Sequence, residues 1–481
     1  MVRKKNGAEA RRQRAARRAF GTTTAIAALL AGSLLAWPAT ADAQRAQLEK
    51  VIRRQVLPNG LEVIVVENHG VPLATVELDV KNGSYTQTPE YAGLAHMYEH
   101  MFFKASKAYP GPDAFTDRTA ELGAVFNGTT TEERVNYYVT LPADSLAGGM
   151  ELVAAGARAP LFRDDELARE KEVVIGEYDR NESSVGFPLQ TETTKLLYPG
   201  NFSRKNVIGD RDVIRTVTPA KMRYIQNKYY VPNNSALIVT GDVQPDTVFA
   251  LARRAFGGWA RGADPFASDP IPPIPALARD TAIISEAPVS AVSVLLQWQG
   301  PSVRKDPEAT YVADVFSDAL NTPGSRFQQR LVDSGLWQGV GVNYYTLNQK
   351  GPITISGQTT AANLKRALAA LDDELAKVGR PGYFTRDELQ VVKTQRGVNT
   401  QLNMERASTL THTIGFWWAV ADLEYFMGYV DNMARQTPAD LERYATTYIV
   451  GKPRVAGVLI SPADRQAAQL SVSDLIRGAV Q

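Results

Sequence analysis

The chain has 481 residues, of which 44% are hydrophobic and 22% are charged, so it is not a disordered chain and is long enough for more than one ordinary domain. Eight of its 53 basic residues lie in residues 1–43, and the remainder has a net charge of −4, which excludes the basic surface typical of nucleic-acid binding. The absence of cysteine excludes disulfide bonds and a cysteine-ligated metal.

Residues 1–43 have the pattern of a secretory signal peptide. A basic start is followed by the short apolar run "TAIAALLAGSLLAW", and Ala41–Ala43 has the small-x-small pattern of a cleavage site. We therefore expect cleavage after Ala43 and a periplasmic product. The pair Arg17–Arg18 resembles a twin-arginine signal, but ordinary basic starts contain such pairs too, so the route stays open. An uncleaved membrane anchor is the alternative.

The remainder of the chain divides into two halves that look alike. The Pro- and Ala-rich residues 262–280 predict a linker between a first domain at 44–261 and a second at 281–481. Each half begins with two β-rich segments, "LEVIVVEN" and "LATVELDV" in the first and "TAIISEA" and "AVSVLLQWQG" in the second, followed by a helical pattern. We expect an α+β fold in both halves.

The helical segments of the two halves can be aligned on their first residues. Thr88–Glu90 and Asp306–Glu308 both combine a capping residue, a proline and an acid, which favours a helix start. This alignment places His96 opposite Asp314 and His100 opposite Asp318. The second half therefore repeats the scaffold without the histidines.

Two of the four histidines lie four residues apart in "GLAHMYEHMFF", with a glutamate between them. On a helix, His96 and His100 share one face and Glu99 reaches the same region. This H-x-x-E-H pattern is typical of a catalytic zinc site, in which a carboxylate takes a proton from water as it attacks a carbonyl. Such a site needs a third protein ligand. The candidates lie on the predicted helix at 164–183 and are Glu170, Glu172 and Glu177.

With "GLAHMYEHMFF" and "REKEVVIGEY", the chain resembles the pitrilysin (insulinase) family of zinc metallopeptidases, of the inverzincin type, in its exported two-domain bacterial form. The resemblance implies two homologous α/β-sandwich domains. It also implies that Zn²⁺ is held by His96, His100 and Glu177, with Glu99 as general base and Glu170 as a supporting acid. Glu172 is then a solvated helix residue.

The resemblance extends to two segments that bind substrate in the family. "GAVFNGTTTEERVNYYV" is similar to the edge strand that holds substrate backbone, which implies substrate binding by Asn127. "SRFQQRLVDSGLW" is similar to a second-domain segment with an Arg and, seven residues later, a Tyr. Arg330 matches the Arg, but Trp337 occupies the Tyr position and has no hydroxyl. Tyr344 or Tyr345 could replace the phenol, although packing is an alternative role for both.

We therefore expect a zinc metalloendopeptidase that hydrolyses peptides or unfolded segments, and no nucleic-acid partner. The family's four-domain chamber implies a dimer, either of this chain or with a zinc-less paralogue that supplies an Arg–Tyr pair. The alternative is a non-catalytic peptide-binding or assembly subunit. Outside this site, we interpret His69 as a turn residue and His412 as structural, since it lies beside an apolar run.

Overall fold

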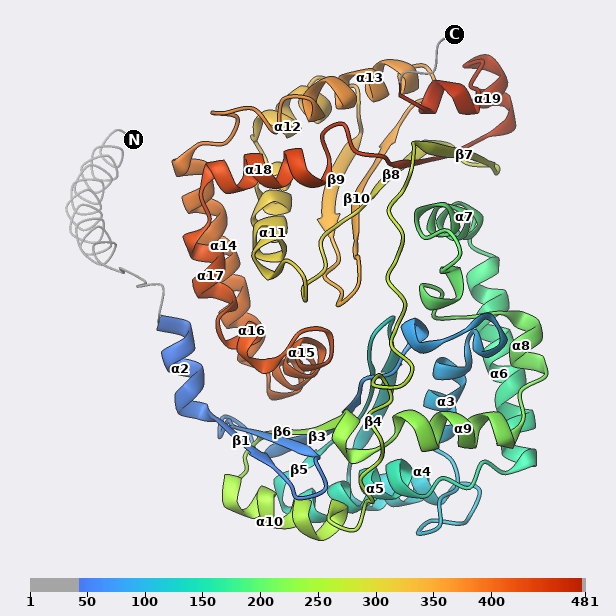
Figure 1. Ribbon diagram of the computed structural model, residues 1–481, viewed down its shortest axis with the longest axis vertical. Helices are drawn as coiled ribbons and strands as arrows, with labels where there is room; N and C mark the ends of the chain where they lie inside the picture. The colour runs from blue at the N-terminus through green and yellow to red at the C-terminus, as the bar shows by residue number, and fades with distance from the viewer. Residues whose placement is uncertain (1–42, 478–481) are drawn as a thin grey trace, which may run out of the picture. The chain divides into compact units, whose positions relative to one another are not determined.

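The structure is a computed structural model that describes residues 43–477 (Figure 1). The predicted signal peptide lies outside the described residues, except for its last residue, Ala43. A compact unit begins at Gln44 and contains two mixed sheets. Within residues 43–477, every helix is too short or too polar to span a lipid bilayer.

The first sheet has six strands in the order β1-β2-β6-β3-β5-β4. Their bounds are β1 (Ile52–Val56), β2 (Glu62–Glu67), β3 (Leu73–Val80), β4 (Val125–Thr130), β5 (Val135–Pro142) and β6 (Ser235–Gly241). The helices of this half are α2 (Ala43–Val51), α3 (Leu94–Phe102), α4 (Ala114–Glu121), α5 (Leu146–Arg158), α6 (Asp164–Glu182), α7 (Phe187–Leu197), α8 (Arg211–Arg215), α9 (Pro219–Tyr229) and α10 (Pro245–Phe256). Strand β6 is buried along its whole length, which explains its nearly continuous apolar sequence.

The second sheet has five strands in the order β7-β11-β8-β10-β9. Their bounds are β7 (Thr281–Glu286), β8 (Val292–Gln299), β9 (Gly339–Tyr344), β10 (Pro352–Thr359) and β11 (Val455–Ile460). The helices are α11 (Pro307–Asn321), α12 (Arg326–Gln328), α13 (Leu364–Leu375), α14 (Arg386–Met404), α15 (Ala407–Val420), α16 (Leu423–Met427), α17 (Tyr429–Arg435), α18 (Pro438–Tyr448) and α19 (Pro462–Ala467). The predicted linker, 262–280, contains neither helix nor strand.

The two sheets repeat one topology. Apart from β1, the order β2-β6-β3-β5-β4 matches β7-β11-β8-β10-β9 strand for strand. The first pair in each series is parallel and the other pairs are antiparallel. Helix α3 follows β3 as α11 follows β8. The predicted α+β class with two related halves is therefore confirmed, and β4 and β9 are equivalent edge strands.

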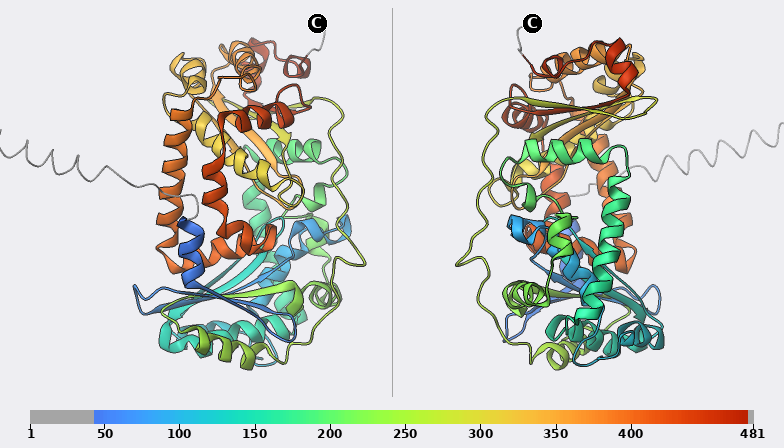
Figure 2. Two further views of the ribbon diagram at one scale, coloured as in Figure 1. Left: turned by 60° about the vertical axis from the view of Figure 1, so that its left-hand side comes forward. Right: turned by 90° about the vertical axis from the view of Figure 1, so that its right-hand side faces the viewer.

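Each sheet is covered on one face by a helix from the other half. Helix α7 of the first half contacts β7, β8 and β11, and α15 of the second half contacts β3 and β6 (Figures 1 and 2). The approach of α15 is close at Gly415, where an added Cβ would lie 2.4 Å from the carboxylate of Asp79. Trp418 Nε1 of α15 also donates to Glu62 Oε2 at 3.0 Å. The second half therefore contributes directly to the structure around the first sheet.

Candidate metal centre

Helix α3 presents His96, Glu99 and His100 from one half-buried side. Its other side is fully buried in the core of the first half, through Leu94, Met97, Tyr98, Met101 and Phe102. The two imidazole rings lie on adjacent turns with centroids 4.9 Å apart and planes perpendicular. Burial of the apolar side fixes the rotation of the helix, and this rotation directs both histidines to the same point.

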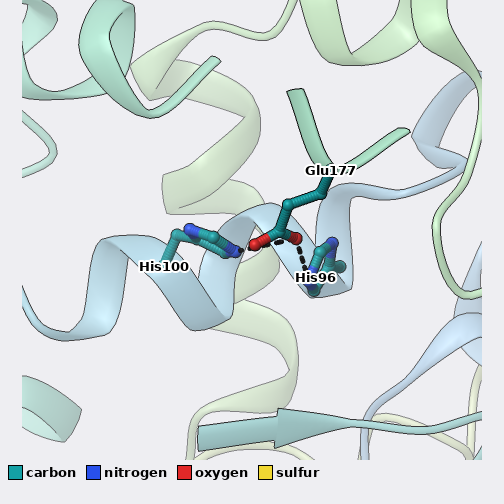
Figure 3. Close-up of side chains that lie close together, drawn as sticks. All are labelled: His96, His100 and Glu177. Carbon is teal, nitrogen blue, oxygen red and sulfur yellow. Dashed lines mark ion pairs between the residues drawn. The ribbon is translucent and has the colours of Figure 1, made fainter. Parts of the chain in front are cut away.

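Helix α6 brings a carboxylate to the two histidines. Oε2 of Glu177 lies 3.5 Å from Nε2 of His96 and 3.7 Å from Nε2 of His100, and Figure 3 shows the three side chains converging. One ligand atom from each lies within 4.8 Å of the others, and no further group of this kind occurs among residues 43–477. The structure therefore brings the histidine pair of α3 together with Glu177, which lies 77 residues after His100 in the sequence.

The donor set fits a zinc ion. Ligand atoms placed tetrahedrally at zinc–ligand distances of about 2.0–2.2 Å lie about 3.4 Å from each other, close to the 3.5 and 3.7 Å observed. Two imidazoles and one carboxylate are a ligand set of catalytic zinc sites, which keep a fourth position open. His96, His100 and Glu177 would hold the ion.

Glu170 contacts the far side of one histidine. Its Oε2 lies 3.1 Å from Nδ1 of His100, and its Oε1 lies 2.6 Å from Nζ of Lys104. Burial opposes the charge of Glu170, but the hydrogen bonds with His100 and Lys104 outweigh it and hold the pKa of Glu170 below its ordinary value. An ionised Glu170 keeps Nε2 of His100 turned toward the centre. Glu172, by contrast, is exposed.

Burial shifts the pKa values of His96 and Glu99 in opposite directions. Burial, with a smaller contribution from His100, lowers the pKa of His96 to about 4, so this imidazole is neutral at pH 7 as a metal ligand must be. Burial also raises the pKa of Glu99 above its ordinary value, although a hydrogen bond from Thr130 opposes the rise. Burial thus favours the uncharged form of both side chains.

A pocket of about 410 Å³ opens at this centre. Its walls come from α3, from β4, from α6 and from the loop at Val207–Ile208, and His96, Glu99 and Glu177 all contribute to its lining. Arg180 of α6 also lines it and is largely exposed, with Nη2 3.8 Å from Glu177 Oε1. Two of the three candidate ligands, His96 and Glu177, therefore face the same open space as Glu99.

Asn127 lies on the neighbouring edge strand but faces away from the metal centre. It is exposed, and its Oδ1 accepts a hydrogen bond from the backbone N–H of Gly128 at 2.9 Å. Side chains alternate along a strand, so Gly128 and Thr130, which contact Glu99, point to the other face of β4. From the sequence we expected Asn127 to bind substrate and did not identify Gly128 or Thr130; period-2 alternation places these two opposite Asn127 but does not say which face meets Glu99.

Arg330 and Trp337 make their contacts within the second half. Arg330 lies on a π-helical turn, is 60% exposed, and places Nε 3.4 Å from Oε2 of buried Glu374. Trp337 is 2% exposed, and its Nε1 donates to the carbonyl of Ala367 at 3.2 Å. The hydroxyl of Tyr344 donates to Pro301 O at 3.0 Å. Trp337 is therefore a core residue whose N–H is already used.

In the second half, the position that corresponds to the metal centre contains an ion pair instead. Nε and Nη2 of Arg396, from α14, contact the two carboxylate oxygens of Asp318 on α11, and Tyr429 donates to Asp314. Asp314 and Asp318 are the residues that the sequence alignment placed opposite the two histidines. A guanidinium thus stands between two helices where the first half has its metal ligands.

Comparison with known proteins gives two family matches and several relatives. Residues 62–198 match the insulinase family (peptidase family M16), and residues 216–396 match the peptidase M16 inactive domain. The chain is 26% identical to the zinc protease PqqE of Helicobacter pylori over 411 residues, which cover 82% of this chain and 89% of that protein. It is 29% identical to the probable zinc protease PqqL of Escherichia coli over 241 residues, which cover 49% of this chain and 25% of that protein.

The solved structures show the same fold. A protease from Helicobacter pylori matches with a TM-score of 0.76 and 23% identity, over 85% of this chain and 99% of that chain. The periplasmic protease PqqL from Escherichia coli matches with a TM-score of 0.73 and 20% identity, over 89% of this chain and 49% of that chain. The chain therefore spans about half or less of PqqL but most of the Helicobacter proteins.

Proposed function

Because the chain belongs to the insulinase family of peptidases (family M16), we propose that it is an exported zinc-dependent endopeptidase that hydrolyses peptides or unfolded segments. Zn²⁺ is the cofactor that this membership implies, since the relatives are named zinc proteases. The observation that carries the proposal is the convergence of His96, His100 and Glu177 at the edge of a pocket that Glu99 also lines.

The chain's own residues divide the work of hydrolysis. When bound, zinc supplies a Lewis acid that lowers the pKa of water and polarises a carbonyl. Glu99 is the general base that takes a proton from the attacking water and gives it to the leaving amine. Glu170 orients His100 through Nδ1. This assignment involves no covalent enzyme intermediate.

The position of β4 at the edge of the sheet supports the proposal that the substrate is a peptide. An extended peptide that pairs with a sheet edge is recognised mainly through its backbone, which makes binding tolerant of sequence. Strand β4 is the edge next to the metal centre, and Gly128, Thr129 and Thr130 line the pocket. We propose that substrate adds to β4, with Asn127 on the other face of the same strand.

A second chain would complete the enzyme. PqqL is about twice as long as the part of it that this chain matches, which supports a partner related to this chain. Trp337, in place of the expected Tyr, leaves this chain without a phenol at that position. We propose a dimer, and specifically a heterodimer with a zinc-less paralogue that supplies an Arg–Tyr pair. In a homodimer, Arg330 of each chain would have to act without that phenol.

Export to the periplasm completes the proposal. The relative PqqL is named a periplasmic protease, and residues 1–43 have the pattern of a signal peptide. Mass spectrometry of the exported protein should find an N-terminus at Gln44. An intact N-terminus in the membrane fraction would show that residues 1–43 are an uncleaved membrane anchor rather than a signal peptide.

The alternative function is a non-catalytic peptide-binding or assembly subunit, which the buried Trp337 favours. Zinc content and cleavage of a mixed peptide library distinguish the two. We expect one zinc per chain and cleavage that a chelator abolishes, rising when the zinc-less paralogue is added. Tight peptide binding without turnover, with and without the paralogue, would favour the alternative. Full activity of the chain alone would refute the donated Arg–Tyr pair.

A further inference from the structure

The side chain of Glu99 has one hydrogen-bond partner from the edge strand. Oγ1 of Thr130 donates to Oε2 of Glu99 at 2.7 Å. Both side chains are partly buried, and hydrogen bonds to an ionised carboxylate are strong in such surroundings. With Oε2 engaged, Oε1 is the oxygen of Glu99 that is left to accept a proton.

Gly128 limits the same side chain from a second direction. A Cβ added to Gly128 would lie 2.8 Å from Cγ and 3.1 Å from Oε1 of Glu99, so only a residue without a side chain fits there. Gly128 and Thr130 are two residues apart and therefore share one face of β4. Thr129, between them, is exposed on the opposite face. Strand β4 thus forms a fitted surface for the carboxylate of Glu99.

The position of β4 is itself fixed at the end nearest Thr130. Thr130 pairs with Val135 across the turn that joins β4 to β5. In this turn, Glu133 accepts hydrogen bonds from the backbone N–H groups of Asn348 and Gln349 in the second half. A hydroxyl carried on such a strand is held in place rather than free to follow the carboxylate.

We propose that Thr130 is a positioning residue for the general base, with Gly128 providing the space that its placement requires. The inference rests on the proposed peptidase function. The proton passes from the attacking water to Oε1 of Glu99 as the water oxygen bonds to the scissile carbonyl carbon. It then passes to the amine nitrogen as the C–N bond breaks. Thr130 keeps Oε1 aimed at this path and takes no proton itself.

The test replaces the hydroxyl while keeping the shape and strand preference of the residue. Thr130→Val should lower kcat about 10- to 100-fold, a part of the full contribution of a general base, with KM changed less than about 2-fold. Zinc content should stay at one ion per chain. Thr130→Ser restores a hydroxyl and should recover most of kcat, and Thr446→Val, on the exposed surface of α18 in the second half, should behave as wild type. Gly128→Ala should lower kcat with zinc retained, since it displaces Glu99 without removing the hydrogen bond donor.

A crystal structure of each zinc-loaded variant gives a readout besides activity. Glu99 should keep its place in Thr130→Ser and move or occupy two conformers in Thr130→Val. The inference is wrong if Glu99 stays in place in Thr130→Val, if this variant keeps wild-type kcat, or if Thr130→Ser is equally impaired. A zinc-loaded wild-type protein without peptidase activity, both alone and with the zinc-less paralogue, would instead refute the proposed function, and the position of Glu99 would still decide whether Thr130 holds it.

Discussion

The backbone N–H of Gln349 donates a hydrogen bond of 3.0 Å to Oε1 of Glu133, and so joins the second half to the turn after β4. Next to it, Arg134 donates to the carbonyl of His412 on α15 and to Glu77 Oε1 on β3. Two successive residues of one turn are therefore held by the zinc-less half. This gives that half a role in placing the strand that carries Gly128 and Thr130.

Glu133→Gln should weaken this connection. A glutamine offers one acceptor oxygen and one NH₂ group, so one of the two backbone N–H donors would lose its acceptor in a buried place. We expect the free energy of unfolding to fall by about 1–3 kcal/mol. Urea denaturation measures it, and the exposed Glu121→Gln serves as a surface control with no change. An unchanged stability of Glu133→Gln would show that the turn is held by other contacts.

Glu133 should also make the stability of the folded protein depend on pH. Burial raises the pKa of Glu133 above its ordinary value of 4.5, so the folded protein binds this proton more tightly than the unfolded chain. The resulting stabilisation is present below pH 4.5 and is lost as the pH rises through the folded-state pKa. The stability of wild type relative to Glu133→Gln should therefore decrease from about pH 4 to pH 7. A relative stability that increases over this range would contradict the raised pKa.

His100→Ala should lose zinc and peptidase activity together, because the two remaining ligands make a poor zinc site. Metal analysis of the purified protein and peptide cleavage measure the two properties. Glu177→Gln should behave in the same way. If Glu177→Gln keeps a full zinc content, another acid is the third ligand, and Glu170, which contacts His100, is the first to test.

Glu99→Gln should keep the zinc and lose most turnover, because it removes the base and leaves the three ligands in place. The expected loss in kcat is about two to four orders of magnitude. Zinc content serves as the internal control. Near wild-type turnover in Glu99→Gln would show that Glu99 is not the general base.

Trp337→Tyr should not raise peptidase activity, because a side chain at this position points into the core of the second half rather than to a substrate. The indole also packs against Gly357, where an added Cβ would lie 2.8 Å from its ring. Losing this fit and the bond to Ala367 O should cost about 1–3 kcal/mol of stability. A gain in kcat would mean that a phenol at position 337 reaches the substrate.

Much of this protein could be predicted from local sequence. The repeated order of β-rich and helical segments predicted two related α+β halves, because strand and helix periodicities are local properties. His96, Glu99 and His100 lie within one helical turn or so, and their spacing alone placed them on one side. The third ligand was different. Spacing left Glu170, Glu172 and Glu177 open, and only a resemblance selected Glu177.

The tertiary structure decided what depends on contacts between distant segments. It placed Thr130 against Glu99 and Glu170 against His100, because these contacts depend on how β4 and α6 meet α3. It turned Asn127 away from the centre, since strand alternation decides faces only once the register with β5 is known. It also buried Trp337 and packed α7 and α15 each against the sheet of the other half. No local pattern contains these outcomes, since each results from burying the apolar faces of elements far apart in the chain.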